Sequence, residues 1–397
     1  MQDIMEEYKV TAEGVGIIPE GVTEIAELAF ENRSDLESIV IPEGVTIIND
    51  NAFYECVNLK SVSIPNSVTT IGRYAFCNCV GLTDITIPES VKLIDNAAFY
   101  GCDNLKDIVI PDGVTHLGSD AFAYCEKWEH LVIPKSVTQI DGSFYACNFK
   151  SIKVDSENPV YDSRNNCNAI IKTERNELVK GCDATHLPDD IEIIGEFAFE
   201  GCRSFVKIIL PRSIRVIYEY AFENCINLEK PEMIGEDFSY YSYDIFDSVG
   251  QSGNEIKVII GKNVKKIPGF IFASSSSYTY NKYTSRITSV EFEKGSVCEE
   301  IGDYAFYECT SLTSINLPDS IANIGQDAFY NCQSLKSINI PDRVTAIGSY
   351  VFSNCIGLQS VTIGTNIKSI GDYAFYYCTN LANVTVLGKL KTISSYA

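Results

Sequence analysis

Several features are scarce in this sequence, and each scarcity excludes a class of protein. The 397 residues include only three histidines, three methionines and one tryptophan. No stretch approaches the roughly 18 consecutive apolar residues of a membrane-spanning helix, so membrane insertion is not expected. Lys and Arg total 31 against 53 Asp and Glu, a net charge of −22, which argues against binding nucleic acid or an anionic membrane surface. We expect a soluble, self-repelling surface and a monomer.

The sequence contains one motif that is repeated many times. The segment LKSVSIPNSVTTIGRYAFCNCVG, from Leu59 to Gly81, recurs along nearly the whole chain with a step of 23 residues. Its clearest mark is an Ala-Phe pair, and 14 coils keep the aromatic ring. These phenylalanines are Phe30, Phe53, Phe76, Phe99, Phe122, Phe144, Phe199, Phe222, Phe246, Phe272, Phe306, Phe329, Phe352 and Phe375. A fixed period of this size predicts a solenoid of stacked coils.

Each coil divides into two parts. Apolar residues first alternate with small polar ones, as at Val62 and Ile64, and Pro65 then ends a short strand. The residues from Val68 to Cys79 follow with apolar spacings of three and four, which predicts one or two short helical turns. The predicted fold class is therefore an α/β repeat, with a parallel sheet on one face and short helical turns on the other.

The combination of these motifs resembles a known family. A Leu-x-x-Val/Ile-x-Ile-Pro strand, a Val-x-x-Ile-Gly step and an Ala-Phe-x-x-Cys turn are similar to the BspA-type leucine-rich repeat of surface proteins. The resemblance implies a leucine-rich-repeat solenoid, located at the cell surface or secreted, that takes part in adhesion or host interaction. It also implies a protein or glycan partner. The first residues, MQDIMEEYKV, lack the pattern of a signal peptide, and the chain stops one residue before the next Phe falls due, as a fragment would.

The repeat predicts a single solenoid domain over residues 1–397 with three irregular parts. Residues 1–28 form a degenerate first coil, as expected of a terminal repeat. Residues 155–186 break the register, and apolar residues on both sides of Glu174-Arg175-Asn176 predict an inserted β-hairpin. Cys167 and Cys182 are symmetric about this turn, so they either form a cross-strand disulfide or remain two free thiols, and the sequence leaves both alternatives open. Residues 238–286 are irregular coils rich in Tyr and Ser.

Most cysteines occupy one position of the repeat. Eleven of the 15 follow the Phe of their coil by three residues: Cys56, Cys79, Cys102, Cys125, Cys147, Cys202, Cys225, Cys309, Cys332, Cys355 and Cys378. Residues at one repeat position stack in a column, where pairing neighbours requires Cα atoms at the low end of the disulfide range. A metal needs several ligands within one site, whereas the column offers one per coil. We therefore predict buried free thiols and no metal.

No catalytic pattern emerges. His116, His130 and His186 lie in separate coils, and the chain has no His-Glu-x-x-His motif, phosphate-binding loop or nucleophile elbow. His130 is predicted to lie on the surface with no Ser or Asp placed for a relay, and Trp128 takes a leucine position in the core. The outward strand positions carry one carboxylate, whereas acid–base chemistry needs a nearby pair. We expect neither an enzyme nor a cofactor.

The candidate binding residues are six tyrosines in the irregular coils: Tyr240, Tyr241, Tyr243, Tyr278, Tyr280 and Tyr283. Tyr mixed with Ser and Gly is typical of adaptable binding surfaces, although inserted surface loops also drift freely in composition. Two functions remain open. The chain is a non-enzymatic interaction module that binds a protein or glycan, or a structural spacer without a specific ligand.

Overall fold

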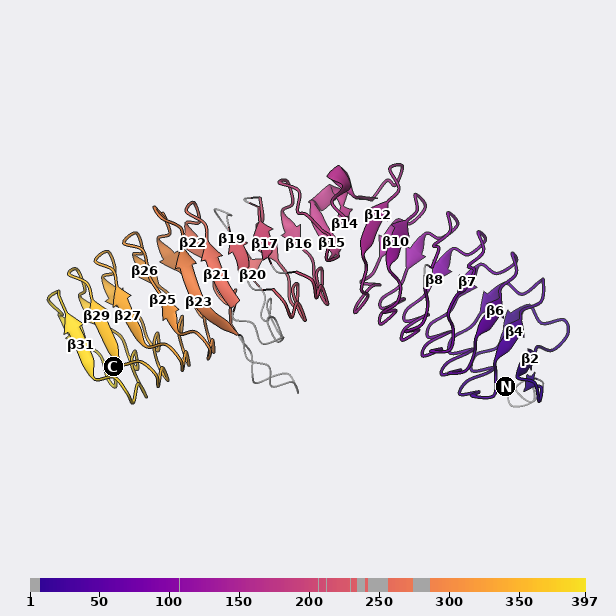
Figure 1. The fold of residues 1–397 in the computed structure, drawn as a ribbon, viewed down its shortest axis with the longest axis horizontal. Helices are drawn as coiled ribbons and strands as arrows, with labels where there is room; N and C mark the ends of the chain where they lie inside the picture. Colours follow the sequence, from indigo (N-terminus) through magenta and orange to yellow (C-terminus); the bar gives the residue numbers. More distant parts are fainter. Residues whose placement is uncertain are drawn as a thin grey trace. The chain divides into compact units, whose positions relative to one another are not determined.

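The computed structural model describes residues 8–397 except 107, 206, 212, 229, 234–239, 242–255 and 274–285. The chain forms two compact units (Figure 1). The first unit contains Met1–Glu174 and Val179–His186, and the second contains Arg175–Leu178 and Leu187–Ala397. The border between them falls within the segment predicted as an insertion. The expectation of one uninterrupted domain stays a prediction.

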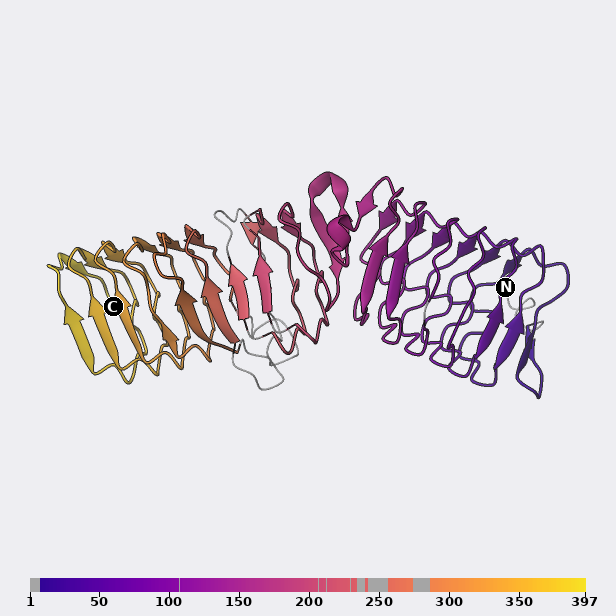
Figure 2. The ribbon, with the colours of Figure 1, turned by 45° about the horizontal axis from the view of Figure 1, so that its top comes forward.

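In both units, coils stack through parallel strands that pair one repeat apart. Ser38 pairs with Ser61 in the first unit and Ser337 with Ser360 in the second. Figure 2 shows these strands running side by side within each unit. We call the outward side of these strands the strand face. In the first unit it is formed by β2 (Val15–Ile17), β4 (Ser38–Val40), β6 (Ser61–Ser63), β10 (His130–Ile133) and β12 (Ser151–Val154).

The second unit has the same strand face. Its strands are β17 (Lys207–Leu210), β19 (Lys230–Met233), β21 (Ile256–Ile260), β23 (Ile287–Phe292), β25 (Ser314–Ile315), β27 (Ser337–Ile340), β29 (Ser360–Ile363) and β31 (Asn383–Val386). Alternate residues point inward, as in β27, where Ile338 and Ile340 are buried while Ser337 and Asn339 are exposed. The predicted solenoid of stacked parallel strands is confirmed.

Two-residue strands form a second ladder, and each of them follows the strand-face segment of its coil. In the first unit these strands are β3 (Glu24–Ile25), β5 (Ile47–Ile48), β7 (Thr70–Ile71), β8 (Leu93–Ile94), β9 (His116–Leu117) and β11 (Gln139–Ile140). In the second unit they are β16 (Ile193–Ile194), β18 (Val216–Ile217), β20 (Tyr240–Tyr241), β22 (Lys266–Ile267), β24 (Glu300–Ile301), β26 (Asn323–Ile324), β28 (Ala346–Ile347), β30 (Ser369–Ile370) and β32 (Thr392–Ile393). Sequence reasoning missed this ladder because two residues are too few to show alternation.

The predicted helical turns around the Ala-Phe pair are not confirmed. The described residues contain only two 3₁₀ helices, each of three residues and both in the insertion. Around Phe76, the Cys77 N–H donates to the Tyr74 carbonyl (3.1 Å), but the Phe76 N–H donates to Ala98 of the next coil (2.7 Å). Tyr74 and Asn78 have φ of 53° and 57°. Every second backbone N–H of this segment therefore donates to the neighbouring coil, and every fourth residue has a left-handed backbone. An α-helix allows neither, so none forms.

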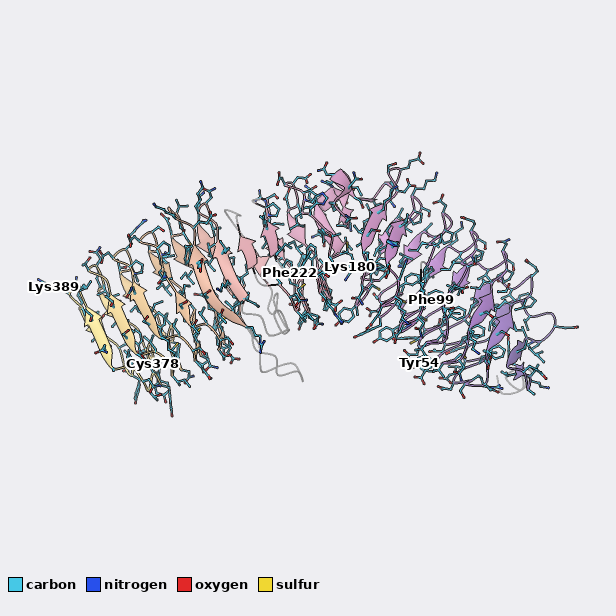
Figure 3. The ribbon with its side chains drawn as sticks, viewed as in Figure 1. Tyr54, Phe99, Lys180, Phe222, Cys378 and Lys389 are labelled. Carbon is cyan, nitrogen blue, oxygen red and sulfur yellow. The ribbon has the colours of Figure 1, made fainter. Side chains whose placement is uncertain are left out.

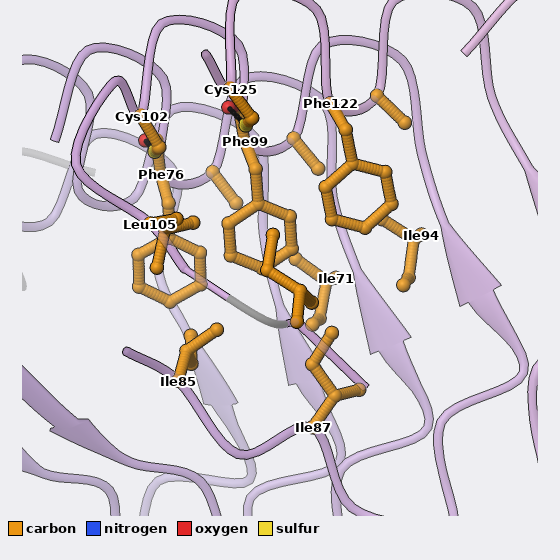
Figure 4. Packing of buried hydrophobic residues seen from close by; sticks show 14 of the residues in the cluster. Ile71, Phe76, Ile85, Ile87, Ile94, Phe99, Cys102, Leu105, Phe122 and Cys125 are labelled. Carbon is orange, nitrogen blue, oxygen red and sulfur yellow. Dashed lines mark hydrogen bonds between the residues drawn. The ribbon is translucent and has the colours of Figure 1, made fainter. Parts of the chain in front are cut away.

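The phenylalanines form the centre of the core. Phe76, Phe99, Phe329 and Phe352 are fully buried, as predicted. Rings of neighbouring coils stack in parallel, with centroids 5.3 Å apart for Phe76–Phe99 and for Phe329–Phe352. Figure 4 shows Phe76, Phe99 and Phe122 of this column beside Ile71 and Ile94 of the second ladder. Phe272 and Phe306 are 34 positions apart in sequence, yet their rings stack at 5.2 Å, so the extra residues between them leave the column intact.

At the start of the first unit, an antiparallel pair replaces the regular coil. Strand β1 (Lys9–Val10) pairs antiparallel with β2. The Tyr8 ring meets the first ring of the column, Phe30, edge to face at 5.4 Å, and the Ala26 N–H donates to the Tyr8 hydroxyl (3.1 Å). Tyr8 therefore covers the end of the Phe column.

The insertion contains three strands. These are β13 (Tyr161–Asp162), β14 (Ala169–Lys172) and β15 (Glu177–Gly181), with η1 (Arg164–Asn166) between the first two and η2 (Thr173–Arg175) between the last two. The last pair flanks the turn expected for the hairpin. Strand β13 pairs antiparallel with β14 and was not foreseen. Asp162 fixes this arrangement by accepting hydrogen bonds from Arg164 (2.7 Å) and Thr173 (2.8 Å).

Candidate functional site

Tyrosines line the turns around the Ala-Phe pairs. Of the 23 tyrosines, 13 lie two residues before, one after or two after the Phe of a coil. They are Tyr54, Tyr74, Tyr100, Tyr124, Tyr145, Tyr220, Tyr304, Tyr307, Tyr330, Tyr350, Tyr373, Tyr376 and Tyr377. Tyr396 holds the same place in the last coil. Figure 3 shows Tyr54 at the edge of the first unit and Phe99 in its interior.

The turn geometry explains why these side chains face outward. Ala and Phe of each pair point into the core, as Ala305 and Phe306 do with no exposed surface. The residue two before the Phe is left-handed, with φ of 58° at Tyr304 and 54° at Tyr373, and the reversal carries its side chain to the outer side. We call this outer side the turn face.

In the second unit, the tyrosines of the last coils pack against one another. The Tyr304, Tyr307 and Tyr330 rings form one group, with centroids 5.6 and 4.9 Å apart. Tyr350, Tyr373 and Tyr396 form a stacked column with spacings of 4.9 and 5.1 Å. Tyr376 lies edge to face with Tyr373 (5.2 Å) and with Tyr377 (4.6 Å). We call these eight residues the tyrosine surface.

Solvent reaches this surface most at its last members. Tyr376, Tyr377 and Tyr396 are 40%, 58% and 70% exposed, whereas the other five are half-buried. The Asn354 side chain donates to the Tyr330 hydroxyl (2.8 Å), which connects the first group to the coil of Tyr350. The rings therefore form two packed groups joined by one hydrogen bond, and the most exposed rings belong to the second group.

Carboxylates accompany these rings. The turns 302–309, 325–332, 348–355 and 371–378 contain Asp303, Glu308, Asp327 and Asp372 and no Lys or Arg. Burial, with added repulsion from Glu308, raises the pKa of the Tyr307 hydroxyl to about 12. Burial also raises the pKa of the Asp327 carboxyl, against hydrogen bonds from Gln326 and Tyr304 that lower it. The Tyr307 phenol thus stays neutral at physiological pH and lies in a negative environment.

The six tyrosines predicted to bind a partner are mostly outside the described residues. Tyr240 and Tyr241 form β20 and pair with Val216 and Ile217 of β18. The other four, Tyr243, Tyr278, Tyr280 and Tyr283, are not described. Sequence reasoning looked for aromatic residues where the repeat breaks down and overlooked those within it. The signal for the tyrosine surface was present as the recurring strings DYAFYEC and DYAFYYC.

One expectation about the strand face needs correction. His130 was expected to have no Ser placed for a relay, but its Nδ1 lies 2.9 Å from Ser151 Oγ, because the two residues pair across β10 and β12. Both hydrogen-bonding groups lie on an open sheet surface. Among the hydrogen bonds of the described residues, none joins a carboxylate to the other ring nitrogen. The pair thus lacks the third, orienting group of a relay. Trp128 is fully buried, as predicted.

The cysteine column is buried, and its thiols have hydrogen-bond partners. All 15 cysteines are thiols outside any disulfide, and all but Cys378 are buried. The Cys102 thiol donates to the Phe76 carbonyl (3.1 Å) and the Cys125 thiol to the Phe99 carbonyl (3.3 Å), each in the preceding coil (Figure 4). Burial raises the pKa of these thiols well above the ordinary value. They are structural donors with little thiolate character.

Cys167 and Cys182 in the insertion are buried and unpaired, so the disulfide alternative is not realised. The Cys182 thiol instead lies 3.5 Å from the Asn168 carbonyl. In the described part of the chain, no three His, Cys, Asp or Glu side chains converge on a possible metal position. Within the same residues, no helix has the length and apolar character needed to cross a bilayer.

Comparison with known proteins identifies the repeat. The family model of the BspA type leucine rich repeat region matches residues 23–150, 179–296 and 299–397 in six copies. A leucine-rich repeat protein from Bacteroides ovatus is 27% identical, with 98% of each chain covered and a TM-score of 0.57. One from Eubacterium ventriosum is 21% identical, with 93% of this chain and 91% of that chain covered and a TM-score of 0.58. No curated protein matches the chain in sequence. The chain belongs to the BspA-type leucine-rich repeat family.

Proposed function

We propose that this protein is a non-enzymatic interaction module, located at a cell surface or secreted, that binds a protein or glycan partner through its tyrosine surface. The observation that carries the proposal is the packing of eight outward-facing tyrosines against one another on a scaffold of stacked coils. Aromatic residues held rigidly lose little entropy on binding and often dominate an interface. The family supports the surface location.

Two features favour binding over a purely structural role for these tyrosines. The core column of Phe already holds the coils together, so ring contacts on the turn face are not needed to close the core. A Tyr with a left-handed backbone also destabilises the fold by roughly 1–2 kcal/mol relative to an ordinary backbone conformation. Gly or Asn at the same position would lower this cost. Retaining Tyr at Tyr304, Tyr350 and Tyr373 therefore favours a role for the side chain.

The test is capture of partners from protein and glycan panels. The variant Tyr307→Ser, Tyr376→Ser, Tyr377→Ser is expected to weaken capture more than tenfold, because buried aromatic anchors contribute about 2 kcal/mol or more each. A control on the strand face, with Ala at Ser63, Thr86 and Ser314, should bind normally. Retention of binding by the Tyr variant would exclude this surface. Capture of nothing by the unmodified protein would favour the alternative of a structural spacer.

The six tyrosines of the irregular coils are proposed as a second contact region. Tyr278→Ser, Tyr280→Ser and Tyr283→Ser together should weaken the same capture without lowering thermal stability, since these residues fall in an insertion that the Phe column bypasses. Unchanged capture by that variant would remove these residues from the site and leave the tyrosine surface alone.

A further inference from the structure

We infer that the tyrosine surface takes a cationic partner, namely an extended, Lys- or Arg-rich segment of another polypeptide. This inference rests on the proposed function, since it names the partner of the same surface. Three observations carry it: the absence of basic residues from four of its turns, the exposed surface of the Tyr376 and Tyr377 rings, and a cation already placed on an equivalent Tyr in the first unit.

Charge is segregated within the last coils. Residues 299–397 contain five basic residues, and all of them lie outside the four turns that hold seven of the eight tyrosines: Lys336, Arg343, Lys368, Lys389 and Lys391. These turns hold four of the eight carboxylates of the same region, and one of the four, Asp327, is buried. Asp303 and Asp372 are exposed. A basic segment thus meets attraction on the turn face, and an acidic segment or a nucleic acid meets repulsion.

The carboxylates also belong to the scaffold, which holds them in place. Asp303 Oδ1 accepts the Gln326 N–H of the next coil (2.8 Å), and Asp372 Oδ1 accepts the Ser395 N–H (3.2 Å). Each carboxylate retains a second oxygen for a ligand. Fixed carboxylates beside fixed rings form a preorganised surface that loses little entropy when a cation binds.

The ring faces suit the same chemistry. Tyr376 and Tyr377 meet edge to face at 84°, so the edge of one ring lies against one face of the other, and the two side chains remain 40% and 58% exposed. A Lys or Arg placed over such a face gains roughly 0.5–1 kcal/mol when exposed and about 2 kcal/mol when desolvated. In the first unit, the Arg73 guanidinium lies 5.6 Å from the centroid of Tyr74, two residues before its Phe. In the second unit, Ser349 and Asp372 precede the equivalent Tyr350 and Tyr373, so the chain supplies no adjacent cation there.

The size of the surface sets the length of the segment. The five coils from Tyr304 to Tyr396, spaced by about 4.8 Å as paired strands are, extend roughly 19 Å from first to last. An extended polypeptide covers this distance with about six residues. We therefore expect a short basic segment to bind this surface with an affinity similar to that of a whole basic domain.

The test uses three probes on the full chain: a capped hexalysine peptide, a capped hexaglutamate peptide and a neutral cello-oligosaccharide, each titrated calorimetrically at low and physiological salt. Hexalysine is expected to bind, and hexaglutamate is expected not to. The variant Tyr376→Ser, Tyr377→Ser should weaken hexalysine binding at least tenfold. Tyr-dependent binding of the oligosaccharide without hexalysine binding would overturn this inference and leave the proposed function standing.

Two matched charge variants distinguish binding at the tyrosine surface from the general attraction of a basic peptide to an acidic protein. Asp303→Asn with Asp372→Asn keeps the acceptor oxygens for Gln326 and Ser395 and removes two charges. Glu291→Gln with Asp319→Asn removes the same charge from exposed positions outside the four turns. We expect only the first variant to weaken hexalysine binding several-fold. Equal losses in both would overturn the inference, since binding would then follow net charge alone.

Discussion

At the scale of single residues, the cysteine column shows how one small side chain serves the whole repeat. Ten of the eleven thiols donate to the Phe carbonyl of the preceding coil. The distance is 2.9 Å from Cys56 to Phe30 and 3.1 Å from Cys355 to Phe329. The repeat position and burial of these thiols could be predicted from the sequence, because the spacing places one per coil. Their hydrogen bonds could not, since the acceptor belongs to another coil.

The buried thiols predict a loss of stability in alkali. Burial raises the pKa of Cys56 to about 12, above the ordinary value of a thiol in the unfolded chain. The unfolded state therefore releases protons first, and the associated stability is complete below about pH 9 and falls as the pH rises toward 12. Urea unfolding under reducing conditions at several pH values measures this slope. Each thiol of this kind contributes up to about 1.4 kcal/mol per pH unit, so Cys56→Ala should show a shallower decline. The same slope in that variant would contradict the assignment.

At the scale of the element, the turn is the part of the coil that sequence reasoning described least well. Apolar spacings of three and four fit both a helical turn and the observed series of tight turns. The distinguishing signal was the residue two after each Phe, which is Asn or Gly in many coils, as at Asn78, Gly101 and Asn331. These residues tolerate a left-handed backbone best, and the three have φ of 57°, 68° and 59°.

Substitution at Asn78 tests the left-handed turn. Asn78→Val places a β-branched side chain at φ 57° and should destabilise the first unit by roughly 1–2 kcal/mol, whereas Asn78→Gly should be close to neutral. Both variants keep the N–H group that donates to Tyr100 (2.7 Å), so the comparison isolates the backbone conformation. Chemical denaturation measures the difference. A helical turn would give the opposite order, with Gly the more harmful replacement.

The Phe column is tested by one truncation. Phe329 is fully buried between Phe306 and Phe352, at centroid distances of 5.2 and 5.3 Å. Phe329→Ala should cost about 3–5 kcal/mol and clearly lower the melting temperature, because a cavity in a stacked column cannot collapse without moving two coils. Ser63→Ala on the strand face is the control and should change little. A small effect at Phe329 would mean that the stack does not hold neighbouring coils together.

At the scale of the whole molecule, every repeated coil contributes some residues to the buried core and others to the exposed turn face. The inward residues were predictable because they recur with the period of the repeat. The tyrosine surface was not identified, because its residues occupy three turn positions that only the left-handed backbone brings to one side. Tyr373, Tyr376 and Tyr377 are neighbours in one turn and contact one another, while Tyr350 and Tyr396 extend the layer into the coils on each side.

The most direct test of the binding account is a footprint of the tyrosines. The full chain is labelled with a tyrosine-selective reagent, with and without saturating bound partner or hexalysine peptide, and each Tyr is quantified by mass spectrometry. Tyr376 and Tyr377, which are 40% and 58% exposed, should react readily in the free protein and at least fivefold more slowly in the complex. Tyr54, on the turn face of the first unit, serves as the internal comparison. Unchanged labelling of Tyr376 and Tyr377 while the partner is bound would contradict the claim that the tyrosine surface is the contact surface.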